Sequence, residues 1–114
     1  MDSAVLWPNR RFQLGEFLID EDRGCIEYNG IAMPVRYKVM QVLMYLLEHA
    51  GRTVATEELL NIVWGPHSTV GKQGITNVIW TLRKLLNDDL GEARVIETIP
   101  KRGYRLLLPV QRLD

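Results

Sequence analysis

Apolar and polar positions alternate along the first third of the chain, which predicts short antiparallel strands. Four apolar side chains carry this period of two: Phe12, Leu14, Phe17 and Ile19. A strand over residues 25–28 and a partner over residues 31–35 are joined by Asn29-Gly30. That dipeptide is typical of a two-residue hairpin, because a type I′ turn needs a positive φ twice. Pro34 places the last of these strands at an edge or an end of the sheet.

From residue 36 the apolar period becomes helical, and three helices are predicted. The first ends before Gly51, and its apolar face contains Val39, Met40, Leu43, Leu46, Leu47 and Ala50. The second begins near Thr56 and ends at Gly65-Pro66, and it buries Leu59, Leu60, Trp64 and one of Ile62 and Val63. The third covers about residues 73–87, with an apolar face of Ile75, Val78, Ile79, Leu82, Leu85 and Leu86. Residues 52–54 form a connector or one extra strand.

A second hairpin is predicted after the helices, with strands over residues 94–99 and 104–108 around the tight turn 100–103. The fold class is therefore α+β, with a small N-terminal antiparallel sheet, three helices and a C-terminal β-hairpin. We expect a flexible lead-in over residues 1–11 and one domain over residues 12–110. Within it, the sheet covers residues 12–35, the helices 36–87 and the hairpin 94–108. A length of 114 residues suits a single domain with a core of its own.

The formal net charge is zero, which taken alone argues against a nucleic-acid-binding protein. The distribution of charge changes this picture. Residues 1–31 contain three basic and six acidic side chains, whereas residues 59–87 contain Lys72, Arg83 and Lys84 and no acid. Lys101-Arg102, with Arg105 close behind, forms a second basic spot. The second half of the chain therefore has the charge expected of a surface that meets phosphates.

The sequence gives no pattern for metal, cofactor or catalytic chemistry. Cys25 is the only cysteine, and His49 and His67 lack metal-ligand spacing, so we expect neither a metal site nor a cofactor. A phosphate loop over Gly65–Lys72 fails on spacing, and a nucleotide-binding enzyme is therefore the weakest reading. No serine has a His/Asp arrangement around it. We expect no enzyme activity and no small-molecule substrate. The apolar runs are too short for a membrane span or a signal peptide, which favours a cytoplasmic location.

The third predicted helix has a polar, acid-free face opposite its apolar one. This face carries Gln73, Asn77, Trp80, Thr81 and Lys84, flanked by Thr76 and Arg83. The major groove of DNA admits one helix whose outward side chains offer donors and acceptors to base edges. A basic hairpin beside such a helix reaches phosphates or the minor groove. This combination predicts a winged helix-turn-helix.

Three motifs in order make residues 12–110 resemble the OmpR/PhoB-type winged-helix DNA-binding domain of bacterial transcriptional regulators. They are Glu57-Glu58-Leu59-Leu60 with Val63-Trp64-Gly65, then Ile79 with Leu82-Arg83-Lys84-Leu85, then Ile96-Glu97-Thr98-Ile99 with Gly103-Tyr104-Arg105. The hairpin tip, residues 100–104, followed by Leu108-Pro109-Val110, resembles the CadC/ToxR-like branch more closely. In that branch a cytoplasmic winged helix precedes a transmembrane segment. The chain could then be the cytoplasmic part of a membrane-anchored regulator.

The resemblance implies sequence-specific binding to double-stranded DNA at direct-repeat half-sites, with a homodimer on DNA. The third helix would lie in the major groove and the hairpin, or wing, in the minor groove or on the backbone. The side chains implied to meet DNA are Gln73, Thr76, Asn77, Trp80, Thr81, Lys84, Thr98, Lys101, Arg102 and Trp64. The family often has arginine at the positions of Pro100, Trp80 and Thr81, so base readout should differ here. Ala55 stands where the family prefers a serine N-cap, which leaves Thr56 as the cap or a weak cap.

Several of these assignments have alternatives. Trp80 could pack against the wing or a neighbouring protomer, and Trp64 is more typical of a core residue than of a contact. Lys101-Arg102 could be solvated turn charge. The winged helix could also serve as a protein–protein interaction module, in which Trp80 and the loop over residues 65–71 meet RNA polymerase or a partner regulator.

Overall fold

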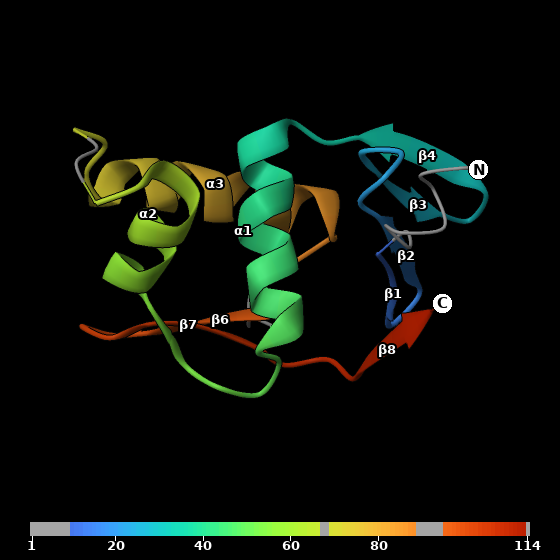
Figure 1. The fold of residues 1–114 in the computed structure, drawn as a ribbon. Coiled ribbons are helices and arrows are strands. Elements are labelled where there is room, and N and C mark those ends of the chain that lie inside the picture. Colours follow the sequence, from blue (N-terminus) through green and yellow to red (C-terminus); the bar gives the residue numbers. More distant parts are fainter. Residues whose placement is uncertain (1–9, 67–68, 89–94, 114) are drawn as a thin grey trace, which may run out of the picture.

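The computed structural model describes residues 10–66, 69–88 and 95–113 (Figure 1). Its larger sheet is antiparallel, with the strand order β4-β3-β2-β1-β8. The strands are β1 (Arg11–Leu14), β2 (Phe17–Asp20), β3 (Cys25–Tyr28), β4 (Ile31–Pro34) and β8 (Val110–Leu113). Asn29 and Gly30 have φ values of 51° and 78°, which confirms the type I′ hairpin between β3 and β4. β4 lies at an edge, as Pro34 predicted.

Strand β8 is absent from the sequence prediction, which ended the domain at residue 110. It pairs with β1 in the register Leu14↔Val110 to Arg11↔Leu113, so both ends of the described chain lie side by side in one sheet (Figure 1). The sheet therefore begins one residue before and ends three residues after the expected bounds 12–110. Residues 1–9, most of the expected lead-in, lie outside the described part of the chain. The local pattern of apolar and polar residues did not predict β8, because the strand that pairs with it is about a hundred residues away in the sequence.

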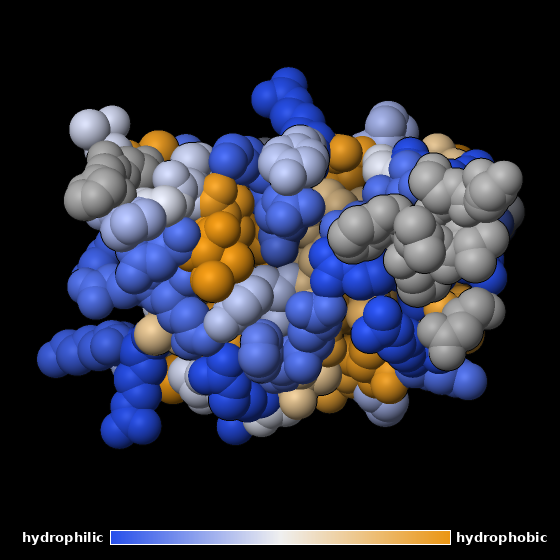
Figure 2. All heavy atoms as spheres, in the orientation of Figure 1, coloured by the Kyte–Doolittle hydropathy of each residue, from blue (hydrophilic) through white to orange (hydrophobic). Residues whose placement is uncertain are grey.

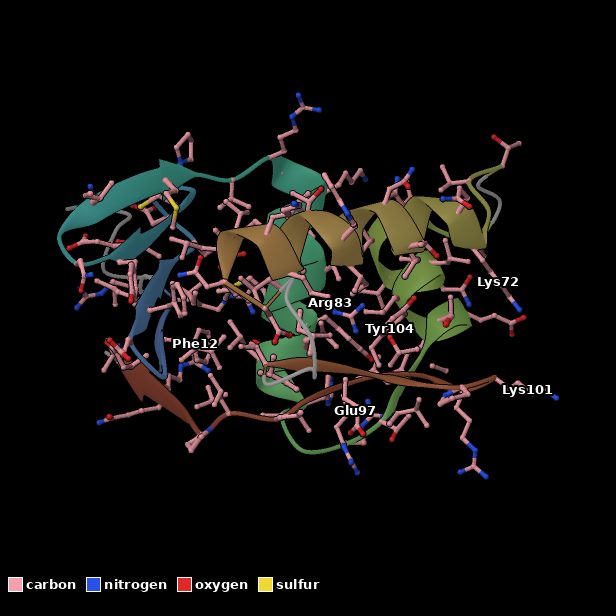
Figure 3. The ribbon with its side chains drawn as sticks, turned by 180° about the vertical axis from the view of Figure 1, so that it is seen from behind. Phe12, Lys72, Arg83, Glu97, Lys101 and Tyr104 are labelled. Carbon is pink, nitrogen blue, oxygen red and sulfur yellow. The ribbon has the colours of Figure 1, made fainter. Side chains whose placement is uncertain are left out.

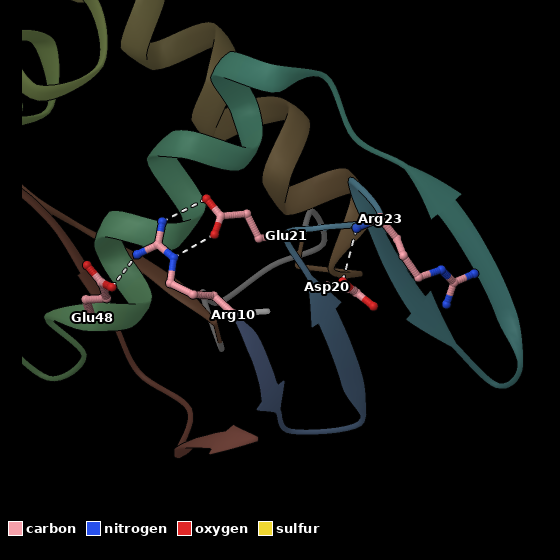
Figure 4. A network of polar contacts seen from close by, with 5 residues as sticks. All are labelled: Arg10, Asp20, Glu21, Arg23 and Glu48. Atoms are coloured by element: carbon pink, nitrogen blue, oxygen red, sulfur yellow. Dashed lines mark hydrogen bonds and ion pairs between the residues drawn. The ribbon is translucent and has the colours of Figure 1, made fainter. Parts of the chain in front are cut away.

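Arg10 links the open end of the β1–β2 hairpin to the first helix through ion pairs (Figure 4). Its guanidinium donates to both carboxylate oxygens of Glu21 at 2.6 and 2.7 Å and also pairs with Glu48. Asp20 is buried, and its Oδ1 accepts the backbone N–H of Arg23 at 3.1 Å, which closes the turn before β3. Asp20 and Glu21, two of the six acidic side chains of residues 1–31, are therefore held in structural contacts.

Helix α1 (Tyr37–Glu48) is the centre of the molecule, with the larger sheet on one side and the other two helices on the other (Figure 1). This position buries two residues outside the predicted apolar face, Val42 and Met44. Ala50, assigned to that face, is instead exposed, because the helix ends at the C-cap His49. A helix packed on several sides needs more than one apolar stripe.

Helix α2 (Thr56–Trp64) and helix α3 (Lys72–Leu85) complete the helix-turn-helix. Val63 is the buried member of the pair left open by the sequence, while Ile62 is exposed. Helix α3 ends two residues earlier than predicted, and Asn87 then takes a positive φ of 54°. Its apolar residues are buried as predicted except for Leu85, which is half-buried.

The wing belongs to a second sheet with the order β5-β7-β6, made of β5 (Val54–Ala55), β6 (Ile96–Ile99) and β7 (Gly103–Leu106). Strand β5 is the extra strand left open between the first two helices. It is so close to β7 that a Cβ on Gly103 would lie 1.9 Å from the carbonyl oxygen of Val54. The backbone N–H of Thr56 donates to the carbonyl of Arg102 at 3.3 Å, which joins the start of α2 to the wing tip.

Two negative findings apply to the part of the chain that the structure describes. No helix there is long and apolar enough to cross a membrane. No three or more His, Cys, Asp or Glu side chains in that part gather into a group that could hold a metal ion.

Candidate nucleic-acid interface

One face of α3 carries five exposed side chains without any acid: Lys72, Gln73, Thr76, Asn77 and Trp80. Lys84 is exposed near the helix end, and Thr81 is half-buried. The opposite face anchors the helix, because Ile75, Ile79 and Leu82 are fully or almost fully buried in the core. The helix therefore presents the polar face that the sequence predicted, on a rigid element.

The polar side chains of this face are ordered by contacts within the helix itself. The Gln73 Nε2 donates to Asn77 Oδ1 at 3.0 Å. The hydroxyl of Thr76 donates to the carbonyl of Lys72 at 3.2 Å, and that of Thr81 donates to the carbonyl of Asn77 at 3.0 Å. Such bonds to the preceding turn occupy the hydroxyl protons. The two carboxamides are therefore the main neutral hydrogen-bonding groups that α3 offers outward, beside the ammonium groups of Lys72 and Lys84.

Trp80 is unusual because a large aromatic side chain stands on a polar face with 62% of its surface exposed. The Lys84 Nζ lies 5.1 Å from the centre of its ring, within the range of a cation–π contact. An indole packed against the wing of the same chain would be largely covered, and Trp80 is not. Within the described residues, the indole therefore keeps an exposed apolar surface on the polar face of α3.

The wing tip supplies cations at one end of α3. Lys101 and Arg102 are exposed, and Lys101 takes a positive φ of 64° in the tight turn. Lys72 and Lys101 lie at the same end of the molecule, far from Phe12 in the larger sheet (Figure 3). In the space-filling view, long hydrophilic side chains protrude at this end (Figure 2). An open cleft of about 470 Å³ separates the two elements. Its lining includes Lys72, Thr76, Thr98, Lys101 and Arg102, together with Glu57 from the start of α2.

Arg83 fixes the angle between α3 and the wing. Its guanidinium donates to the carbonyl of Ile96 at 2.8 and 3.3 Å and to Thr98 Oγ1 at 2.8 Å. Asp88 adds a second link, because its buried carboxylate accepts the backbone N–H of Ile96 at 2.9 Å. Thr98 thus accepts a bond from Arg83 and keeps a hydroxyl proton for a further acceptor. Arg83 flanks the polar face in the sequence, where an ion pair or a phosphate contact was more plausible than base readout. The structure gives it hydrogen bonds to a backbone carbonyl and a hydroxyl.

Arg105 does not add to the basic spot at the wing tip as the sequence suggested. It stands directly across from Glu97 in the β6–β7 register, and its NH2 pairs with Glu97 Oε1 at 2.6 Å. Cross-strand pairs of opposite charge stabilise a hairpin. The cations of the wing tip are therefore Lys101 and Arg102.

Trp64, at the end of α2, is half-buried and packs against the hydrophobic core. The Lys38 Nζ lies 5.8 Å from its ring centre and donates to the carbonyl of Val63 at 2.8 Å. The core role favoured by the sequence is confirmed. A contact of its indole with phosphate remains a prediction.

Sequence reasoning did not single out the start of α1, which borders the exposed face of α3. A groove of about 720 Å³ runs between them and is lined by Arg36, Tyr37, Asn77 and Thr81 among others. Tyr37 is 71% exposed. The run Arg36-Tyr37-Lys38 was the signal in the sequence that could have identified this border.

A polar cluster at the start of α2 compensates for its missing side-chain cap. The N-cap is Ala55 and makes no side-chain hydrogen bond, which confirms that the cap is weak. Glu58 accepts hydrogen bonds from Arg52 at 2.9 and 3.4 Å and from the hydroxyl of Tyr45. These bonds, from Arg52 first and Tyr45 second, lower the pKa of Glu58 to about 2. The backbone N–H of Ala55 adds to this effect, as in one half of a capping box.

Glu58→Gln is expected to destabilise the domain by about 1 kcal/mol at neutral pH, a value reduced for the partial exposure of the pair. A pKa that is lowered on folding gives stability that is fully present above the ordinary glutamate pKa and is lost as the pH falls toward 2. Urea unfolding between neutral pH and pH 2 measures this. Over this pH range the free energy of unfolding of Glu58→Gln should fall less steeply than that of the parent chain. Substitution of the exposed neighbour, Glu57→Gln, serves as the control. An equal slope for Glu58→Gln and the parent chain would contradict the assignment.

Comparison with known proteins identifies the arrangement. Residues 32–106 match the family model described as "Transcriptional regulatory protein, C terminal". The transcriptional activator CadC of Escherichia coli is 33% identical over 99 residues, which are 86% of this chain and 19% of that protein. The transcriptional regulator HilA of Salmonella typhi is 35% identical over 102 residues, 90% of this chain and 18% of HilA. The chain thus spans about a fifth of the length of these relatives.

The fold comparison agrees with the sequence comparison. The solved DNA-binding domain of E. coli CadC superimposes with a TM-score of 0.79 at 31% identity, and the match covers 90% of this chain and 95% of that one. The resemblance to the OmpR/PhoB type and its CadC/ToxR-like branch is confirmed, as is the winged helix-turn-helix fold. The family is one of regulatory domains and not a class of enzymes. The chain therefore belongs to the family of C-terminal domains of transcriptional regulatory proteins, in its winged-helix form.

Proposed function

We propose that this chain binds double-stranded DNA sequence-specifically, as the non-catalytic DNA-binding domain of a bacterial transcriptional regulator that acts in the cytoplasm. The observation that carries the proposal is the acid-free exposed face of α3 beside the cationic wing tip. Arg83 and Asp88 hold the two at a fixed angle. A rigid pair of elements is what simultaneous contact with two adjacent grooves requires.

In this proposal α3 enters the major groove, where Gln73, Thr76, Asn77, Trp80 and Thr81 face base edges. Lys101 and Arg102 meet the adjacent minor groove or the backbone, and Lys84 lies near a phosphate. The hydroxyl of Thr98, already held by Arg83, donates its proton to a phosphate oxygen. The acidic turn residues beside the larger sheet, Glu16 and Asp20 to Asp22, lie away from DNA in this proposal, because their charge would be repelled there.

Two copies on direct-repeat half-sites, forming a homodimer on DNA, extend this proposal. Contact with RNA polymerase through residues 65–71 is a further part of it, although residues 67–68 lie outside the described chain. The use of the winged helix as a protein-only module is less favoured, since its relatives are transcriptional regulators and its fold matches a DNA-binding domain. In this family, DNA binding and contact with a protein partner can occur in one domain.

Fluorescence anisotropy with mixed-sequence duplex DNA tests the proposal directly. With three to six cations in reach, the slope of log affinity against log salt should be modest, roughly −3 to −5. A duplex with two half-sites should bind much more tightly than one with a single half-site, because contact between the two copies adds a coupling free energy to the binding of each. Absence of salt-sensitive binding at low salt would refute DNA binding. Equal affinity for single and double sites would refute the paired arrangement alone.

A further inference from the structure

The face of α3 lacks the side chain that most often reads guanine. Guanine presents two acceptors, O6 and N7, in the major groove, and arginine is their commonest bidentate partner. Arg83 is the one arginine of α3, and three hydrogen bonds commit its guanidinium to Ile96 and Thr98. Reading a base with Arg83 would break these hydrogen bonds between the helix and the wing. Of the two lysines in α3, Lys72 lines the cleft beside the wing and Lys84 lies over the Trp80 ring.

The carboxamides of Gln73 and Asn77 instead match the edge of adenine. Their mutual bond uses one N–H of Gln73 and the carbonyl oxygen of Asn77. The Gln73 carbonyl oxygen and the Asn77 amide nitrogen then serve as one acceptor and one donor. Adenine offers the complementary pair, an N6 amino donor and an N7 acceptor. Because the pair is ordered before binding, less side-chain entropy is lost on contact.

Trp80 and the two threonines favour an apolar feature in the same groove. Only thymine presents one there, its C5-methyl group. Trp80 offers a 62% exposed indole on the polar face. Thr76 and Thr81 donate their hydroxyl protons to the helix backbone, so each offers a methyl group and an acceptor oxygen but no donor to the groove.

The wing independently favours A·T-rich DNA. Lys101 and Arg102 are exposed at a narrow two-strand tip that can enter the minor groove. A·T-rich segments have a narrow minor groove with enhanced negative potential, which attracts such side chains. Both DNA-facing elements therefore favour the same base composition.

We infer that the half-site of this domain is rich in A·T pairs, with adenine read by the Gln73–Asn77 pair and a thymine methyl in contact with Trp80. This inference rests on the proposed DNA-binding function and names the class of sequence that the domain selects. The wing then lies over a neighbouring A·T-rich minor groove.

Selection of bound duplexes from a random library by the whole chain is the first experiment. We expect enrichment of half-sites with A·T pairs under α3 and an A·T-rich flank under the wing. Enrichment of guanine at the α3 positions, or no base preference at all, would overturn the inference while leaving DNA binding intact. Absence of duplex binding at low salt would overturn the proposed function itself.

Base analogues then test each contact on the selected site. Replacing thymidine by deoxyuridine removes only the methyl group and should weaken binding about threefold to fivefold at the position that meets Trp80. Trp80→Ala should remove this sensitivity. Ile31→Ala, which changes an equally exposed apolar residue in the larger sheet, should retain it. Deoxyuridine sensitivity that survives in Trp80→Ala would contradict the assignment of Trp80.

A second base analogue tests the contact between the carboxamides and adenine. Replacing adenine by 7-deazaadenine removes the N7 acceptor and should weaken binding roughly threefold to tenfold. Asn77→Ala should lose this sensitivity, whereas Gln111→Ala, an exposed carboxamide on β8, should keep it. Thermal unfolding of each variant separates a lost contact from a lost fold. An Asn77→Ala variant as sensitive as the parent chain would exclude the adenine contact.

Discussion

Lys84→Glu combined with Lys101→Glu is expected to weaken binding to duplex DNA about 100-fold or more at low salt. In the proposed complex each reversal removes a cation near a phosphate and adds a repelled anion, so the effect exceeds that of neutral substitutions. Both side chains are exposed, and the fold should tolerate the changes. Anisotropy titrations at several salt concentrations measure the loss, which should shrink as salt rises.

The matched control reverses two arginines of the larger sheet, Arg23→Glu and Arg112→Glu. It alters net charge by the same amount but changes positions on β8 and in the turn before β3. We expect a much smaller loss of affinity, since these charges lie at the far end of the molecule from the wing. Equal losses in both double variants would mean that binding follows net charge and not the surface formed by α3 and the wing. Full affinity in the Lys84/Lys101 variant would favour the protein-only module.

Gly103→Ala is expected to destabilise the domain by about 3 kcal/mol, with a fall in Tm of roughly 10 °C or more. The new Cβ would lie 1.9 Å from the Val54 carbonyl oxygen and under 3.0 Å from two further backbone atoms. Backbone cannot rotate out of the way as a flexible side chain does, so β5 and β7 must separate. That separation also shifts the wing tip, which the carbonyl of Arg102 joins to the start of α2.

Gly71→Ala provides the control for this substitution. Gly71 is the N-cap of α3, has a φ of −93°, and has open space where a Cβ would be. Gly71→Ala should lower the free energy of unfolding by about 1 kcal/mol or less. Thermal and urea unfolding of both variants give the comparison. If Gly103→Ala is as stable as Gly71→Ala, the close approach of β5 and β7 does not limit the residue at this position.

The sequence by itself determined the elements whose signals are local. Three apolar periods of 3.6 residues placed α1, α2 and α3 within two residues of their observed ends, and Asn29-Gly30 specified its hairpin. The acid-free polar face of α3 also follows from spacing alone, since an apolar stripe on one side fixes what faces outward. The family resemblance added the DNA-binding assignment to these elements.

Only the tertiary structure decided which partners distant residues take. Strand β8 pairs with β1, Val63 and not Ile62 is buried, and Glu97 neutralises Arg105 across the wing. The sequence placed Arg83 beside the polar face of the third helix, but its hydrogen bonds to Ile96 and Thr98 exist only because β6 lies beside α3. Periodicity describes which face of an element is buried, but the choice among distant partners is settled by packing. For this domain, that packing engages Arg83 and Arg105 in contacts within the fold and leaves Lys101 and Arg102 exposed at the wing tip.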